Sequence, residues 1–148
     1  MFKSLITKQT VAHNRRGFTI LELVVVLLII SILAGFLYQK FSGREQASKI
    51  AATYSSILRH YEAGKSYLAN HGTTDFTNAT TANLEADGLI TAGVTNPWGN
   101  AFTITTTAAT FRVATTVDTA TTATALRDQF TAQGYTAGGT GTNVAITF

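Results

Sequence analysis

Apolar side chains fill the sequence from Leu23 to Gln39, seventeen residues without a charge that are mostly Leu, Val and Ile. Extending this stretch back to Phe18 gives twenty-two residues, which only the carboxylate of Glu22 interrupts. As a helix these residues would be roughly 33 Å long, enough to cross a hydrocarbon core of about 30 Å. The pattern therefore predicts a hydrophobic transmembrane half-helix over residues 18–40.

Beyond residue 40 the pattern becomes amphipathic. Apolar residues recur there at helical spacing and form one face: Ile50, Tyr54, Ile57, Leu58, Tyr61 and Leu68. The pair His71-Gly72 is typical of a helix end. One continuous helix over the fifty-three residues from Phe18 to Asn70 would be roughly 80 Å long. A small domain can cover only the distal half of such a helix, so lipid or other copies of the chain must cover the rest.

The remainder is rich in threonine, with 23 of the 76 residues from Thr73 to Phe148. Alternation of apolar and polar residues over 101–105 and 110–117 predicts a β-hairpin connected by 107–110. Val144, Ile146 and Phe148 alternate in the same way and predict a closing strand. The chain is therefore expected to have an α+β fold, in which the distal half of a long N-terminal helix packs on a small antiparallel β-sheet.

Shorter elements are expected between these parts. Leu84, Leu89 and Ile90 indicate a short helix or an irregular segment packed on the core. The segment 96–100, with the only proline, predicts a turn before the first strand. Leu126 and Phe130 are expected to face inward from a short helix that ends near Gly134. Asp118 or Thr121 is expected to be its N-cap. A flexible glycine loop is expected over 138–141.

Positive charge is concentrated at the N-terminus. The first seventeen residues carry a charge of +4 and no acid, from Lys3, Lys8, Arg15 and Arg16. The whole chain has a formal charge of +3, so the residues from 18 onward balance at −1, with seven bases against eight acids. The positive-inside rule therefore places the basic tail in the cytoplasm. Nucleic acid is not indicated as a partner, because the basic character belongs to the tail alone.

Two ordinary explanations compete for the apolar stretch. A cleaved secretory signal would have a shorter apolar run and a small-x-small cleavage site, whereas bulky residues at 38–41 follow here. A plain single-pass anchor has the right length, but an unpaired carboxylate such as Glu22 costs about 2–3 kcal/mol in a spanning helix. A cut between Gly17 and Phe18 would create an α-amine four residues before Glu22. The amine of a neighbouring subunit, displaced along a bundle, would then pair with this carboxylate.

The residues from Arg15 to Leu37, beginning Arg-Arg-Gly-Phe-Thr-Ile-Leu-Glu-Leu, resemble the signature of type IV prepilins. The resemblance implies that prepilin peptidase cuts after Gly17 and N-methylates Phe18, and that Glu22 is the charge needed for assembly. It also implies a hydrophobic filament core, formed by Leu23, Val24, Val25, Val26, Leu27, Leu28, Ile29, Ile30, Ile32, Leu33, Phe36 and Leu37.

On this resemblance residues 1–17 are a cleaved basic leader peptide and residues 41–148 a globular pilin domain. The domain would consist of the distal half-helix over 41–71, a variable segment over 72–100 and a Thr-rich β-sheet region over 101–148. The long leader, an apolar helix without proline and a helix between late strands lean toward the type IVb group. The Asn-Pro-Trp-Gly turn at 96–99 also resembles one in major pseudopilins and in some type IVb pilins.

The expected function is a structural subunit of a type IV pilus-like filament. The precursor would lie in the inner membrane with a cytoplasmic N-terminus, and the mature chain would form a homopolymer at the cell surface. Its implied partners are prepilin peptidase and the inner-membrane platform protein and assembly ATPase of the pilus machine. A pseudopilin of a type II secretion system and a plain membrane-anchored binding protein remain the alternatives.

Nothing in the sequence points to catalysis or to a cofactor. There is no cysteine, and His13, His60 and His71 lack metal-ligand spacing. The eight carboxylates contain no recognisable pair for acid–base chemistry, and neither a serine elbow nor a nucleotide motif is present. We therefore expect neither an enzyme nor a metal site.

Overall fold

The computed structural model describes residues 18–148. The chain divides into two compact units with their boundary between Lys40 and Phe41, and helix α1 (Ile20–His71) begins in the first unit and ends in the second. The other elements all belong to the second unit: α2 (Thr81–Ala86), β1 (Thr103–Thr106), β2 (Phe111–Thr116), α3 (Ala120–Ala132), β3 (Thr136–Gly138) and β4 (Asn143–Thr147). A long N-terminal helix with a small sheet confirms the α+β class.

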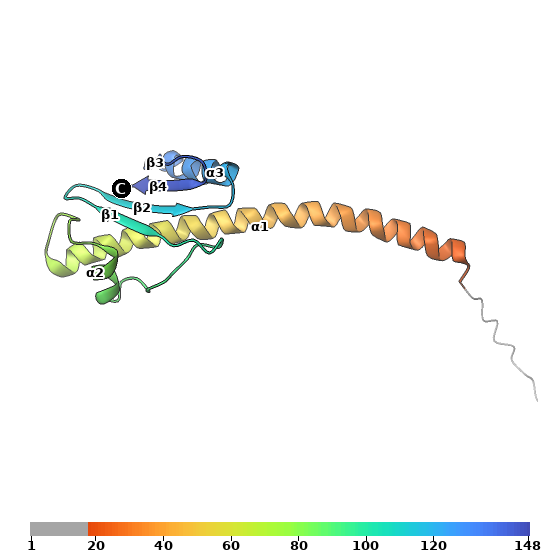
Figure 1. The fold of residues 1–148 in the computed structure, drawn as a ribbon, viewed down its shortest axis with the longest axis horizontal. Coiled ribbons are helices and arrows are strands. Elements are labelled where there is room, and N and C mark those ends of the chain that lie inside the picture. Colours follow the sequence, from red (N-terminus) through yellow and green to blue (C-terminus); the bar gives the residue numbers. More distant parts are fainter. Residues whose placement is uncertain (1–17) are drawn as a thin grey trace, which may run out of the picture. The chain divides into compact units, whose positions relative to one another are not determined.

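The four strands form one antiparallel sheet in the order β1-β2-β4-β3 (Figure 1). The predicted hairpin is confirmed: Thr106 pairs with Phe111, and the Thr107 N–H donates to the Thr110 carbonyl at 2.9 Å across the turn. The predicted closing strand is β4, which lies between β2 and β3. Strands β2 and β3 are therefore joined only through β4.

Strand β3 differs from the sequence-based expectation, which places Gly138 in a flexible loop. The structure places Gly138 at the end of β3, opposite Ala145 of β4. The tight connection begins at Gly139, whose φ of 114° is unfavourable for other residues. A Cβ at Gly139 would lie 2.3 Å from the carbonyl oxygen of Asn143. Gly139 therefore makes a compact β3–β4 turn possible, and β3 adds one short strand to the sheet.

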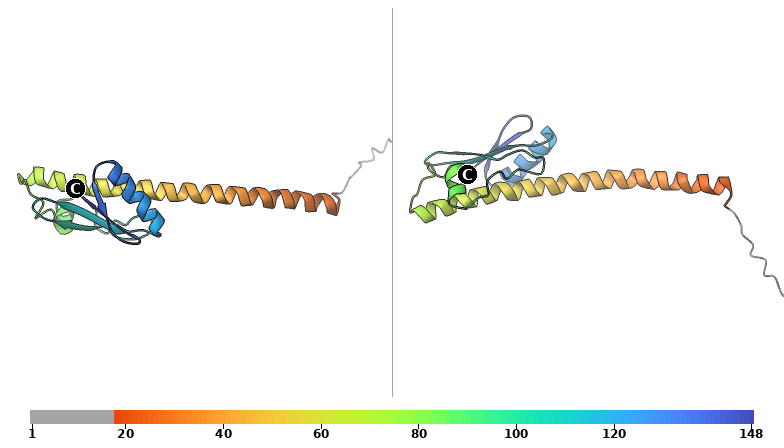
Figure 2. Two further views of the ribbon diagram at one scale, coloured as in Figure 1. Left: turned by 90° about the horizontal axis from the view of Figure 1, so that it is seen from above. Right: turned by 60° about the horizontal axis from the view of Figure 1, so that its bottom comes forward.

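The helix expected before Gly134 is α3, which runs next to β3 and β4 (Figure 2). Leu126 and Phe130 are fully buried, as predicted. The N-cap prediction is wrong, because neither Asp118 nor Thr121 caps the helix. Thr119 does so, with its hydroxyl oxygen accepting from the Thr122 N–H at 3.2 Å.

Asp118 instead connects α1 to the segment before α3. Its Oδ2 accepts from the Nε2 of Gln46 at 2.8 Å, and its Oδ1 accepts from the Thr119 N–H at 2.8 Å. The hydrogen bond from Gln46 is the main reason why the pKa of Asp118 lies below its usual value. Asp118 is exposed, so this contact orients the loop more than it stabilises the domain.

Within the second unit, α1 packs along one face of the sheet. Its buried residues recur at helical spacing: Thr53, Ile57, His60, Ala63, Gly64 and Tyr67. Of the predicted apolar residues, Ile57 belongs to this line and the others flank it. Tyr54 and Tyr61 are half-buried and contact Phe130 and Phe148. The Tyr61 and Phe148 rings are stacked 4.1 Å apart. The predicted face is therefore correct, but its centre is lined by smaller and more polar residues.

Gly64 lets α1 pack directly against the ring of Phe111 on β2. A Cβ at this position would lie 2.7 Å from Cε2 of Phe111. The Phe111 ring is fully buried and is also packed against Phe76, with ring centroids 5.4 Å apart. The ring therefore has little room to move, and the absence of a side chain at Gly64 is a packing requirement.

Replacing Gly64 by alanine should lower the free energy of unfolding of the second unit by about 1 kcal/mol. Overpacking costs about 1–3 kcal/mol, and the better helix propensity of alanine returns only about 1 kcal/mol. Thermal unfolding of the full chain in detergent measures the difference.

Gly43→Ala is the matched control, because a Cβ at Gly43 meets no atom within 4 Å. This substitution should be neutral or stabilising by up to about 1 kcal/mol. Equal effects of the two substitutions would contradict the packing role of Gly64.

The segment between α1 and β1 covers one end of this core. Leu84 of α2 is fully buried, and α2 lies beside the last turns of α1 (Figure 1), where His71 Nδ1 is 3.6 Å from Asp87 Oδ2. The predicted turn at residues 96–100 is confirmed, with the Gly99 N–H donating to the Asn96 carbonyl at 2.9 Å. Trp98 is half-buried against the core, as expected for an anchor of the turn.

Asn96 is the buried polar centre of this turn, only 3% exposed. Its Nδ2 donates to the Thr115 hydroxyl at 3.0 Å and to the Thr116 carbonyl at 2.7 Å. Its Oδ1 accepts from the Trp98 and Asn100 N–H groups, both at 3.0 Å. The side-chain amide therefore uses both donors and its acceptor, and it fixes the turn to β2.

Candidate functional site

The start of α1 contains the charge that the sequence singles out. Phe18 and Thr19 precede the helix, and Thr19 is its N-cap: its hydroxyl oxygen accepts from the Glu22 N–H at 3.2 Å. The Thr19 carbonyl accepts from the Leu23 N–H at 3.1 Å. The spacing Thr-x-x-Glu is typical of a capping box, a local signal that the apolar pattern alone does not reveal.

Glu22 therefore lies in the first turn of α1, where the partial positive charge of the helix N-terminus favours an anion. The residue is exposed. Among the described residues its carboxylate has neither a hydrogen-bond donor nor a cation as partner. The helix N-terminus compensates part of the cost of this charge. The exposed carboxylate is accessible to a cationic group from outside the chain, which could compensate the rest.

The residues after Glu22 form a surface that is apolar on all sides of the helix. Their side chains are between 44% and 70% exposed. The set is the predicted filament core: Leu23, Val24, Val25, Val26, Leu27, Leu28, Ile29, Ile30, Ile32, Leu33, Phe36 and Leu37. A helix with no polar face is typical of a membrane span or of the interior of an assembly.

Length and hydropathy agree with this assignment. Within the part of the chain that the structure describes, α1 alone is long and apolar enough to cross a membrane, and its most apolar window has a mean hydropathy of 3.0 with none of it buried. Ser31 is the polar exception within this stretch. Its hydroxyl donates to the Leu27 carbonyl at 2.7 Å, so the helix itself satisfies this group, as a lipid environment requires.

The other predicted residues of the cleavage site are only partly in view. Phe18 is 77% exposed just before the helix. Gly17, with the rest of the predicted leader over 1–17, lies outside the described residues. Within residues 18–148 no group of three or more His, Asp or Glu side chains is arranged to hold a metal ion.

Comparison with known proteins adds one finding at this end of the chain. Residues 12–38 match the family model described as the prokaryotic N-terminal methylation motif. The matched segment includes Gly17, Phe18, Glu22 and the whole exposed apolar surface from Leu23 to Leu37. Neither a curated protein nor a solved structure shows a significant match to this chain.

Proposed function

We propose that this chain is the precursor of a pilus-like filament subunit. Its prepilin-type methylation motif supports membership of the type IV pilin and pseudopilin family. The motif indicates a structural subunit rather than an enzyme family. It implies processing by prepilin peptidase and delivery to a pilus or secretion assembly machinery. Together with the apolar helix, it indicates a membrane-anchored precursor.

The proposed processing step is cleavage between Gly17 and Phe18, followed by N-methylation of Phe18. Cleavage would remove the basic tail and leave a cation within one helical turn of Glu22. Among the described residues no group of the same chain pairs with the Glu22 carboxylate. The amine of a neighbouring copy, shifted along the bundle, is therefore the proposed partner of this carboxylate.

The observation that carries the proposal is the exposed apolar surface from Leu23 to Leu37, next to one carboxylate without a partner among the described residues. In the precursor, lipid would cover this surface, with the N-terminus in the cytoplasm. In the filament, the same surface would pack against the helices of other copies. A homopolymer at the cell surface follows, built by an inner-membrane platform protein and an assembly ATPase.

The N-terminal mass of the mature protein tests the processing step. We expect a chain that begins at N-methylated Phe18 and lacks residues 1–17. The matched variant Gly17→Val should keep Met1, because the resemblance to prepilins implies a cut after a glycine. A wild-type protein that retains Met1 in its native membrane would refute the proposal and leave a plain single-pass anchor.

A pseudopilin of a type II secretion system is the second candidate function. The observation behind it is the turn Asn96-Pro97-Trp98-Gly99, which the buried Asn96 amide holds together. This turn resembles one in major pseudopilins and in some type IVb pilins. Both candidates share the processed N-terminus and the helical packing. Fibres of this chain in material sheared from cells would support the pilin, and their absence would support the pseudopilin.

A further inference from the structure

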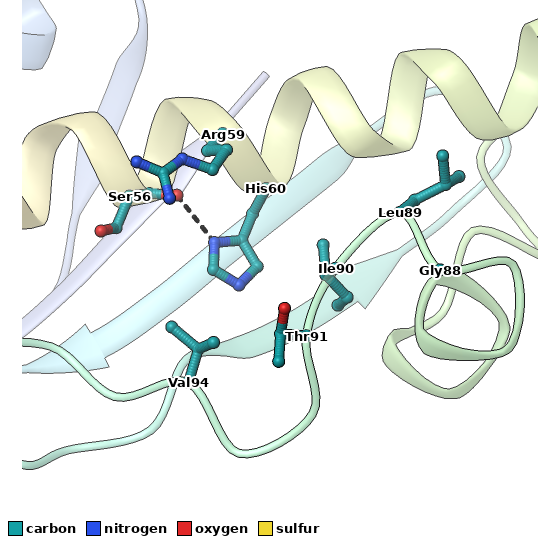
Figure 3. A pocket seen from close by; sticks show the side chains of 8 residues that line it. All are labelled: Ser56, Arg59, His60, Gly88, Leu89, Ile90, Thr91 and Val94. Atoms are coloured by element: carbon teal, nitrogen blue, oxygen red, sulfur yellow. Dashed lines mark hydrogen bonds between the residues drawn. The ribbon is translucent and has the colours of Figure 1, made fainter.

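A pocket lies within the second unit, between α1 and the segment 88–94 (Figure 3). Its volume is about 120 Å³. The polar lining comes from Ser56, Arg59 and His60 on α1 and from Thr91 on the segment, and the apolar lining comes from Leu89, Ile90 and Val94. A comparable apolar cavity of about 150 Å³ admits benzene, so this pocket has room for one ring or a short branched chain.

His60 gives the pocket a polar atom without a protein partner among the described residues. The residue is only 7% exposed, and its ring packs on Phe102 with centroids 4.7 Å apart. Its Nδ1 is 2.7 Å from the Ser56 carbonyl oxygen, which can only accept, so Nδ1 carries a proton. In a neutral ring Nε2 is then an acceptor, and no described residue donates to it. The ring points toward the segment 88–94 (Figure 3).

The charged residues around the pocket indicate the chemistry of its ligand. Arg59 is exposed and lines this pocket at its solvent side, and no carboxylate lines it among the described residues. Glu85 lines the adjoining pocket instead, which shares His60, Ile90, Thr91 and Val94 with the first. A guanidinium is suited to a carboxylate, while Nε2 of His60 is suited to a hydroxyl donor. The apolar lining between these groups favours an organic body over an inorganic anion.

From these contacts we infer that the pocket binds a small hydroxylated organic acid. Its carboxylate would contact Arg59, its apolar body would contact Ile90 and Val94, and its hydroxyl would donate to His60 Nε2. The ligand would hold the segment 88–94 against α1. This inference does not depend on the proposed processing or assembly, because every residue in it belongs to the second unit.

Titration with 4-hydroxybenzoate tests the inference on the full mature chain in detergent micelles. We expect saturable NMR shifts of the His60 Nε2 resonance and of the amides of Gly88 and Gly93, with a Kd near the millimolar range. His71 is the internal reference, since it lies outside the pocket. The absence of a His60 shift up to the solubility limit of the probe would overturn the inference.

Two matched comparisons separate a site from unspecific partition into the micelle. Arg59→Gln should weaken binding of 4-hydroxybenzoate about tenfold, whereas Arg112→Gln, which changes an exposed arginine on β2, should not. The uncharged 4-hydroxybenzamide should bind wild type and Arg59→Gln equally. If Arg59→Gln leaves the affinity for the acid unchanged, the carboxylate site is refuted.

Discussion

Replacing Glu22 by glutamine should abolish filament formation while the chain still inserts into the membrane. In the proposed assembly the Glu22 carboxylate compensates the amine of a neighbouring copy inside an apolar bundle. Leaving one member of a buried charge pair alone costs roughly 3–5 kcal/mol. Every subunit would bear this cost, so we expect a loss of sheared filaments of about a hundredfold or more.

Two observations make this result interpretable. Glutamine has the size of glutamate and remains compatible with the first helical turn, so the helix and its Thr19 cap should persist. Glu62→Gln is the matched control, because Glu62 is exposed on the same helix and pairs only with Lys65 at 3.3 Å among the described residues. Normal filaments from Glu22→Gln would refute the charge-pair argument, and equal losses from both variants would refute its specificity.

Replacing Asn96 by alanine should lower the free energy of unfolding of the second unit by about 3 kcal/mol. The substitution removes four hydrogen bonds of a residue that is 3% exposed, and it leaves the Thr116 carbonyl and two N–H groups with fewer partners. Trp98 is adjacent, so its fluorescence during thermal unfolding of the full chain in detergent measures the change.

Asn100→Ala is the control for this prediction. The Asn100 side chain donates one hydrogen bond, to the Thr116 carbonyl at 2.9 Å, so its loss should cost only about 1 kcal/mol. Asn96→Asp should be at least as harmful as Asn96→Ala, because a carboxylate would face the Thr116 carbonyl without a donor. A stable Asn96→Asp protein would contradict the assigned orientation of the amide.

The sequence predicts the face of α1 that packs on the sheet, but not the residues at its centre. Apolar periodicity identifies Ile57 and the flanking tyrosines. It omits Thr53, His60 and Gly64, because a threonine, a histidine and a glycine are not typical core residues. Their burial depends on neighbours far along the chain, such as Phe111 over Gly64 and Phe102 against His60. Periodicity contains no information on those contacts.

The same limit explains the other differences. A three-residue strand such as β3 has too few positions to show alternation, and its pairing is decided by the turn at Gly139. Thr119 competes with two neighbouring residues that cap helices equally well in isolation, and the fold selects among them. At the site, the apolar stretch and Glu22 are local and predictable from the sequence. The proposed partner of Glu22 belongs to another copy, so neither one sequence nor one chain displays it.

The position of β4 between β2 and β3 should make the domain stable under reducing conditions. Many type IV pilins stabilise their C-terminal region with a disulfide bond, which this chain cannot form because it has no cysteine. Here backbone hydrogen bonds from both neighbours of β4 do that work. The domain should therefore fold without an enzyme that forms disulfides, and thiol reductants should not unfold it, whereas heat should.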